Sequence, residues 1–318
     1  MQDSVSVVPP GKLVFGIHLP IAAQSKAFAQ GWESGAGTAE IRRIAEVCDR
    51  AGYFYLAVSD HVAVPRDLAP AMSTVWYDTV ATLGFVAAAT ARIRLLSYVA
   101  VLPYRHPLVT AKSYATVDAL SDGRLILGVG AGHVEKEFEA LGIDFRRRGK
   151  LLDEAIDAVA DAFRSEYPSF EGPTWSYRDL GQQPRPVQKP RPPIWVGGST
   201  EAALRRAAER GDGWLPQGPP AMGMAAAIDL VRSHREKKRG GAPIDIGMNA
   251  PWMYVGEPSW TVPEGTLTGS AERLLEPIWS ARKLGVSHVG VRFRARSCDE
   301  LCEQLEAFAT EVAPHAES

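Results

Sequence analysis

Several short apolar runs of this chain end in residues that could bind a ligand or move a proton. One run ends in Ser59-Asp60-His61, which places a carboxylate beside an imidazole. Because an imidazole titrates near neutral pH, His61 could transfer a proton while Asp60 binds a polar ligand. The same dipeptide could do no more than cap a loop, so its role depends on what lies around it.

Two glycine-rich turns form a second kind of candidate site, Gly130-Ala131-Gly132-His133 and Gly197-Gly198-Ser199-Thr200. Glycine lets a backbone approach a ligand closely, and the N–H groups that open a helix bind anions such as phosphate. Both turns could instead be ordinary helix caps, and the first lacks the third glycine of a GxGxxG dinucleotide turn. The basic run Arg146-Arg147-Arg148 could hold a phosphate or form a solvated loop face.

The elements that would position these residues alternate along the chain as strand and helix. The predicted strands are residues 13–19, 53–59, 93–101, 124–130, 193–197, 213–216, 244–255 and 288–293. They are apolar almost throughout, as strands covered on both faces of a parallel sheet are. Amphipathic segments between them, such as 38–51 before Gly52, predict helices. Eight such units predict a single α/β domain over residues 1–318, a (β/α)8 TIM barrel with its site at the C-terminal strand ends.

Two segments, 165–192 and 217–224, are longer than a bare barrel needs. We expect insertions at the C-terminal face of the barrel, where binding loops lie. The first segment could alternatively cover the outside of the barrel. Side chains in or near these loops could line an apolar pocket or pack on the barrel rim: Trp175, Tyr177, Met222, Met224 and Trp252.

Composition excludes several classes of protein. The 318 residues include 35 Lys and Arg against 37 Asp and Glu, a net charge of −2, which argues against a nucleic-acid binder and against a disordered chain. The three cysteines, Cys48, Cys298 and Cys302, form neither a disulfide framework nor a zinc motif, so we expect packing thiols and no metal. No apolar run is long enough to span a membrane, and the N-terminus lacks a signal-peptide pattern, so we expect a cytoplasmic protein.

Taken together, four segments resemble the bacterial luciferase-like superfamily, in particular its branch that depends on the deazaflavin coenzyme F420. They are AVSDHVAVP (57–65), residues 89–156 around SDGRLILGVGAGHVEKEF, residues 184–216 around PIWVGGSTEAALRRAAERGDGW, and LGVSHVGVRF (284–293). The resemblance extends over nearly the whole chain. It implies one barrel that binds an isoalloxazine-like ring at its C-terminal face.

The resemblance also implies roles for residues at the second and third strand ends. His61 would transfer a proton or stabilise the ring, its pKa tuned by Asp60 and burial, and Asp60 would contact the cofactor. The third strand would carry a bulge, following Ser97, with a non-proline cis peptide between Tyr98 and Val99 that backs the ring.

At the fourth and fifth strand ends, the resemblance implies that Gly130, Ala131 and Gly132 contact the cofactor. It further implies that Gly197, Gly198 and Ser199 bind its phosphate. His133 stands where sugar-phosphate-oxidising members have Glu and many other members have Trp. This difference puts sugar-phosphate oxidation in doubt and leaves His133 as a second proton donor or a residue that shapes the substrate pocket.

The expected function is hydride transfer between F420 and a small organic substrate. One alternative is a monooxygenase that uses reduced FMN, oxygen and a partner flavin reductase. Another is a flavin-binding barrel without activity. The family suggests a homodimer, and the substrate cannot be identified from the sequence.

Overall fold

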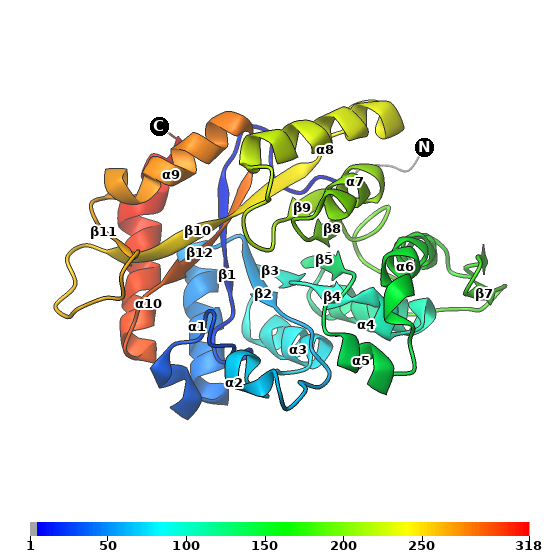
Figure 1. Cartoon of the computed structure of the whole chain (residues 1–318), viewed down its shortest axis with the longest axis horizontal. Helices are drawn as coiled ribbons and strands as arrows, with labels where there is room; N and C mark the ends of the chain where they lie inside the picture. Colours follow the sequence, from blue (N-terminus) through cyan, green and yellow to red (C-terminus); the bar gives the residue numbers. More distant parts are fainter. Residues whose placement is uncertain (1–4, 318) are drawn as a thin grey trace.

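The computed structural model describes residues 5–317, and the predicted strands form a closed parallel barrel (Figure 1). The third predicted strand is divided into β3 and β4. The barrel strands are β1 (Val14–His18), β2 (Tyr55–Val58), β3 (Arg94–Ser97), β4 (Ala100–Val101), β5 (Leu125–Gly130), β8 (Ile194–Gly197), β9 (Gly213–Leu215), β10 (Asp245–Val255) and β12 (His288–Phe293). With β3 and β4 counted as one divided strand, both paired with β5, neighbours in this order pair in parallel, and β12 returns to pair with β1, which closes the wall.

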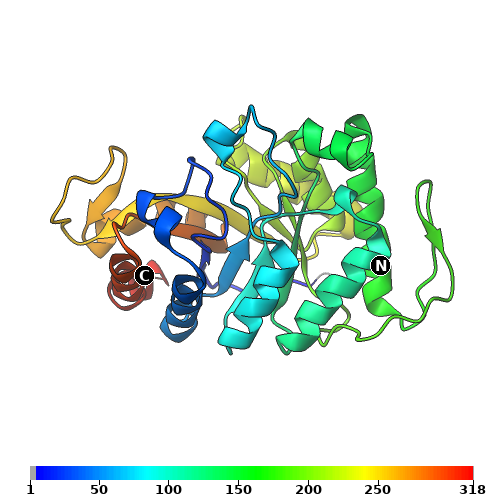
Figure 2. The ribbon, with the colours of Figure 1, turned by 90° about the horizontal axis from the view of Figure 1, so that it is seen from below.

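Helices follow the strands and cover the outside of the barrel (Figures 1 and 2). The longer ones are α1 (Thr38–Ala51), α3 (Thr79–Ala89), α4 (Pro107–Leu120), α6 (Arg148–Arg164), α7 (Glu201–Arg210), α8 (Met224–Arg239), α9 (Ala271–Leu284) and α10 (Cys298–Ala307). As predicted, α1 ends at Gly52, which has the left-handed conformation (φ 82°) that glycine adopts without strain. None of the helices in residues 5–317 is long and apolar enough to cross a membrane.

Short elements lie in the connections: α2 (Ala69–Met72), α5 (Glu135–Ala140) and the 3-10 turns Gly31–Gly35, Leu102–Tyr104 and Phe145–Arg147. Helix α9 begins at Ala271, after the N-cap Ser270. Residues Leu267–Gly269 before the cap form β11, because β10 extends beyond the barrel and pairs with them.

Alternation along the strands separates two apolar layers. On β12, Val289 and Val291 pack outward in the main core between wall and helices. His288 points into the barrel, where its ring stacks on Trp195 at 4.1 Å between centroids. This period of two places Gly290 and Arg292 on the inner face as well, and both border the cavity described below.

The two long segments have different positions. Residues 165–192 form a hairpin, β6 (Phe170–Glu171) and β7 (Ser176–Tyr177), at the edge of the molecule against α6 (Figure 2). The Glu154 carboxylate of α6 accepts hydrogen bonds from the backbone N–H groups of Thr174 and Trp175, and the Tyr177 hydroxyl donates to the Ala158 carbonyl. This segment is therefore the outer cover that the sequence left as an alternative. In contrast, the segment 217–224 begins at the barrel mouth, where Gln217 and Gly218 border the cavity.

The remaining sequence expectations concern cysteines and metals. All three cysteines are free thiols, with Cys48 and Cys302 buried and Cys298 partly buried. Within the described residues, no group of three His, Cys, Asp or Glu side chains could hold a metal ion.

Candidate active site

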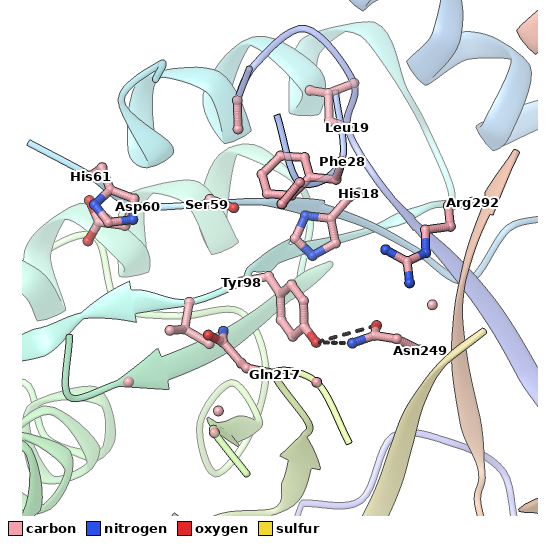
Figure 3. A pocket seen from close by; sticks show the side chains of 18 of the residues that line it. His18, Leu19, Phe28, Ser59, Asp60, His61, Tyr98, Gln217, Asn249 and Arg292 are labelled. Carbon is pink, nitrogen blue, oxygen red and sulfur yellow. Dashed lines mark hydrogen bonds between the residues drawn. The ribbon is translucent and has the colours of Figure 1, made fainter. Parts of the chain in front are cut away.

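A cavity of about 710 Å³ opens at the C-terminal ends of the barrel strands (Figure 3). Its wall takes residues from the end of β1, the loop after β2, the β3–β4 junction and the turns after β5 and β8. It is completed by β10 and β12. A volume in this range is typical of sites for cofactors and other small molecules. Most of the predicted site residues line it: Asp60, His61, Tyr98, Val99, Gly130, Ala131, Gly132, His133, Gly197 and Gly198.

His61 lies at one side of the cavity and is held by a carboxylate. Its Nδ1 is 2.8 Å from Oε2 of Glu137, on α5, and the two side chains are only 10% and 1% exposed. Burial favours a raised pKa for Glu137, but hydrogen bonds from His61 and from the N–H groups of Ala63 and Val62 outweigh it and leave the pKa below its usual value. Glu137 is therefore a carboxylate. Nδ1 of His61 must carry the proton, which leaves Nε2 as the nitrogen that can accept one.

Asp60 borders the same cavity, but its carboxylate pairs with a different residue. Its carboxylate forms a two-pronged ion pair with Arg105, at 2.6 and 2.8 Å, and accepts the N–H of Val101 at 2.9 Å. The sequence assigned the tuning of His61 to Asp60 and burial, but the carboxylate in contact with its imidazole is that of Glu137. Although residues 60 and 61 are adjacent, their carboxylate and imidazole contact different partners. Asp60 anchors the β3–β4 junction at the edge of the cavity.

The predicted bulge and cis peptide both occur at this junction. Tyr98 and Val99 are joined by a cis bond. Three residues lie between the paired Leu96 and Ala100, whereas two lie between their partners on β5, so the strand has one extra residue. Ser97 is fully buried behind the wall, where its hydroxyl donates to the Gly128 carbonyl, and it does not reach the cavity.

Val99 explains two of the glycines. A Cβ added to Gly197 would lie 2.5 Å from Cγ1 of Val99, and one added to Gly130 would overlap Cγ2. Both strand ends therefore need glycine because the Val99 side chain occupies the space between them. The sequence suggested contact with a ligand at these positions, and the packing adds a second requirement.

His133 follows the turn after β5 and is exposed at the cavity edge. Its ring centroid lies 5.4 Å from that of His61, edge to face. Desolvation and the neighbouring His61 lower the His133 pKa. His133 is thus more often neutral than a free histidine at the same pH.

A cationic corner lies where β5 and β8 end. The Thr200 hydroxyl caps α7 by accepting the N–H of Ala203, and Arg148 and Arg206 border the cavity beside it. The guanidinium of Arg206 is paired with Asp153 at 2.6 Å. That of Arg148 donates to the Phe145 carbonyl and stacks on the Phe145 ring at 3.8 Å. A helix N-terminus beside arginines favours an anionic group.

Ser199 lies outside the cavity lining, between this corner and the loop after β9. Its hydroxyl donates to the Gly218 carbonyl and accepts the Gln217 N–H, at 2.7 and 3.0 Å. These bonds fix residues 217 and 218, which do border the cavity.

On the opposite side of the cavity, Tyr98 was predicted from the sequence, but His18, Asn249 and Arg292 were not. His18 ends β1 and packs edge-on against Tyr98, with ring centroids 4.3 Å apart (Figure 3). The Tyr98 hydroxyl donates to the Pro216 carbonyl at 2.5 Å and accepts from Asn249 Nδ2 at 3.1 Å. Burial and, to a smaller extent, the charge of nearby Arg292 lower the pKa of His18 to about 3, while burial raises that of Tyr98 to about 12. Both groups are neutral at physiological pH.

A signal for these residues exists in the sequence. His18 is a polar residue at the end of an apolar run, and Arg292 shares a strand face with Gly290 by its spacing of two. Of the residues in the predicted rim set, Trp252 borders the cavity, whereas Trp175, Tyr177, Met222 and Met224 do not.

Comparison with solved structures confirms the barrel. A monooxygenase from Streptomyces bottropensis superposes with a TM-score of 0.77 at 22% identity, covering 95% of this chain and 99% of that one. The coenzyme F420-dependent tetrahydromethanopterin reductase of Methanopyrus kandleri gives 0.74 at 18% identity, covering 96% and 99%. At these identities the likeness shows the fold alone.

Comparisons of sequence identify the family of the chain. An uncharacterised protein of Mycobacterium tuberculosis is 32% identical over 220 residues, 64% of this chain and 74% of its own length. The FMNH2-dependent dimethylsulfone monooxygenase of Pseudomonas putida is 27% identical over 212 residues, 66% of this chain and 56% of the relative. The model of the luciferase-like monooxygenase family matches residues 15–259. The chain therefore belongs to the luciferase-like monooxygenase family.

Proposed function

We propose that this protein is an oxidoreductase that transfers a hydride between coenzyme F420 and a small organic substrate, with His61 moving the accompanying proton. The observation that carries the proposal is the His61–Glu137 pair at the cavity wall. Its buried carboxylate holds Nδ1 and leaves Nε2 available, an arrangement typical of a general acid or base. His133, whose pKa is lowered, is a second group that could accept a proton.

The residues present fit a flat tricyclic cofactor with a phosphate. The cavity volume of about 710 Å³ and its largely apolar lining suit the ring. Tyr98 and Val99 at the bulge would support it, and the turn 130–132 would lie at its edge. The cationic corner at Thr200 and Arg148, together with Gly197 and Gly198, would hold the phosphate.

When bound, F420 would supply hydride chemistry at C5 of its ring, and the protein would orient the substrate and handle the proton. Glu137 fixes the proton of His61 on Nδ1, so Nε2 accepts a proton in one reaction direction and returns it in the other. The Glu137 carboxylate would also stabilise the imidazolium that forms. Loops 19–37 and 59–78 supply cavity residues such as Phe28 and Trp76 that would exclude water from the ring.

F420 is favoured over FMN by the cationic run at residues 146–148. F420 continues beyond its phosphate into a chain of carboxylates, whereas FMN ends at the phosphate. Arg148 borders the cavity, and Arg146 and Arg147 precede it in the sequence with exposed side chains, Arg147 also donating to the Thr174 hydroxyl at 3.0 Å. These two arginines could bind the carboxylate tail but would have no partner on FMN. The reduced-FMN monooxygenase remains the second candidate, supported by the 27% identical dimethylsulfone monooxygenase.

Titrating the purified protein separately with F420 and FMN, followed by quenching of tryptophan fluorescence, tests the cofactor assignment. We expect the tighter complex with F420. Replacing Arg146 and Arg147 together by Gln should weaken F420 binding about tenfold and leave FMN binding unchanged. The exposed Arg178→Gln variant is the control for loss of surface charge. Tighter binding of FMN, unaffected by the double variant, would reverse the assignment.

The role of His61 is tested in single-turnover reoxidation of reduced F420 by a panel of small carbonyl and enone acceptors. His61→Asn should slow reoxidation about 100-fold or more while F420 affinity changes less than twofold. Full activity of this variant would remove His61 from the mechanism.

A further inference from the structure

Arg292 is a cation of the cavity that forms an ion pair with none of the carboxylates in the described part of the chain. It lies on the inner face of β12, two residues after Gly290, and borders the cavity (Figure 3). Its Nε donates to the Ala250 carbonyl at 3.2 Å, and its guanidinium lies 5.1 Å from the Trp252 ring centre. Within residues 5–317, Nη1 and Nη2 donate to no protein acceptor and no carboxylate lies within ion-pair distance.

The acidic side chains that line the cavity are bonded to groups other than Arg292. Asp60 pairs with Arg105. The Glu33 carboxylate, although it borders the cavity, accepts the backbone N–H groups of Ile21 and Gln30 at 2.8 and 2.7 Å. Neither compensates the charge on Arg292.

The groups near the guanidinium are neutral or cationic. His18 and Tyr98 are uncharged at physiological pH, and Arg294 is a second cation, stacked on the same Trp252 ring. Burial lowers the pKa of Arg292, yet a guanidinium remains protonated in proteins. A positive charge that is partly removed from water without an anion is unfavourable. The energetics therefore favour an anion that arrives with a ligand.

The position of an anion at Arg292 differs from the position proposed for the cofactor phosphate. In the strand order around the barrel, β12 lies three strands from β8 in one direction and four from β5 in the other. The cationic corner at β5 and β8 and the Arg292 side are therefore on opposite walls. A single phosphate cannot contact both, so Arg292 is available to a second anionic group.

We propose that Arg292 binds the oxyanion head group, a carboxylate or a sulfonate, of an organic substrate. The two Nη atoms present the planar donor fork that matches such a group. His18 and Tyr98 would contact the apolar part next to the head group, and the anion would fix which carbon lies over the ring. Naming this group as substrate rests on the proposed function, whereas its binding does not.

Isothermal titration with hexanoate, hexanesulfonate, hexanol and hexylamine tests the binding without any reaction. The wild-type protein should bind one or both anions and neither the alcohol nor the amine, and the preferred anion identifies the head group. Arg292→Met should weaken anion binding about tenfold or more, and Arg292→Lys less. Arg294→Met is the matched control, because Arg294 also stacks on Trp252, at 3.9 Å, but does not line the cavity. Thermal unfolding of each variant checks that it is folded.

The outcomes separate the two proposals. Anion binding that depends on Arg292 in a protein that binds neither F420 nor FMN would support this inference and overturn the proposed function. Cofactor binding and turnover with anion affinity equal in Arg292→Met and wild type would do the reverse. Loss of F420 affinity in Arg292→Met, with anion binding unchanged, would assign Arg292 to the cofactor and overturn the inference.

Discussion

His61 depends on a partner 76 positions away in the sequence. Asp60 is the adjacent carboxylate in the sequence, yet it is paired with Arg105. Glu137 reaches His61 from α5 and also accepts the Tyr104 hydroxyl at 3.1 Å. One carboxylate thus orients the imidazole and ties the loop after β2 to the helix after β5.

Replacing Glu137 by Gln should reverse the proton position on His61. An amide in place of the carboxylate would donate to Nδ1, so the proton of the neutral ring would move to Nε2, where it blocks proton acceptance. We expect proton-accepting turnover to fall about tenfold or more, with cofactor affinity nearly unchanged. The nitrogen chemical shifts of the His61 ring report the tautomer directly.

Glu135→Gln is the control for this experiment, because Glu135 is exposed in the first turn of the same helix. It should leave both the tautomer and turnover as in the wild type. Wild-type nitrogen shifts in Glu137→Gln would show that Glu137 does not determine the state of the ring.

Among the elements, the β3–β4 junction has the tightest requirements. Its extra residue carries Val99 into the space at the ends of β5 and β8, where the glycines have no side chains. The positions of Val99 and of the turn after β8 are therefore coupled. A substitution at either position should therefore alter cofactor binding.

Gly197→Ala tests this coupling. Its added Cβ would lie 2.5 Å from Cγ1 of Val99, and overpacking of this kind costs about 1–3 kcal/mol. We expect a loss of stability of that size in urea unfolding and weaker cofactor binding. Combining it with Val99→Ala, which removes Cγ1, should restore part of both losses. Strictly additive effects in this double-mutant cycle would mean that the two positions are independent.

How much of these elements the sequence predicts depends on the range of the forces involved. Buried parallel strands are apolar throughout, so the eight runs were visible without a structure, and Gly52 indicated the end of α1 correctly. The hairpin of residues 165–192 was ambiguous, because its attachment depends on Glu154 from a distant helix turn.

The site was predictable where residues are adjacent and not where they meet across the barrel. The strand-end positions of His61, Gly130 and Gly197 followed from the barrel pattern and the resemblance. The Glu137 contact and the lone charge of Arg292 could not be predicted, since both depend on which side chains the closed wall brings together.

For the whole molecule, the arrangement of charge is more informative than its sum. The net charge is −2, but the cavity places cations at opposite walls, at Arg148 and at Arg292. The other end of the barrel is closed by buried side chains. There Asp245 accepts the N–H of Val7 and the indole N–H of Trp195, and His288 stacks on the same indole. Burial raises the Asp245 pKa to about 6.

Because His288 is buried at this closed end, we expect acid to lower the free energy of unfolding. Burial lowers the His288 pKa from 6.5 to about 3. Between these values the unfolded chain binds a proton that the folded protein does not, so the free energy of unfolding falls as the pH falls. From pH 7 to pH 5 this one group should remove about 2 kcal/mol. His288→Phe keeps an aromatic ring on Trp195 without the titration, so urea unfolding should show that much less loss over the same interval. Any packing change in the variant acts equally at both pH values and cancels. Exposed His315→Asn should behave as the wild type. An equal loss in His288→Phe and wild type would show that His288 can bind its proton in the folded barrel.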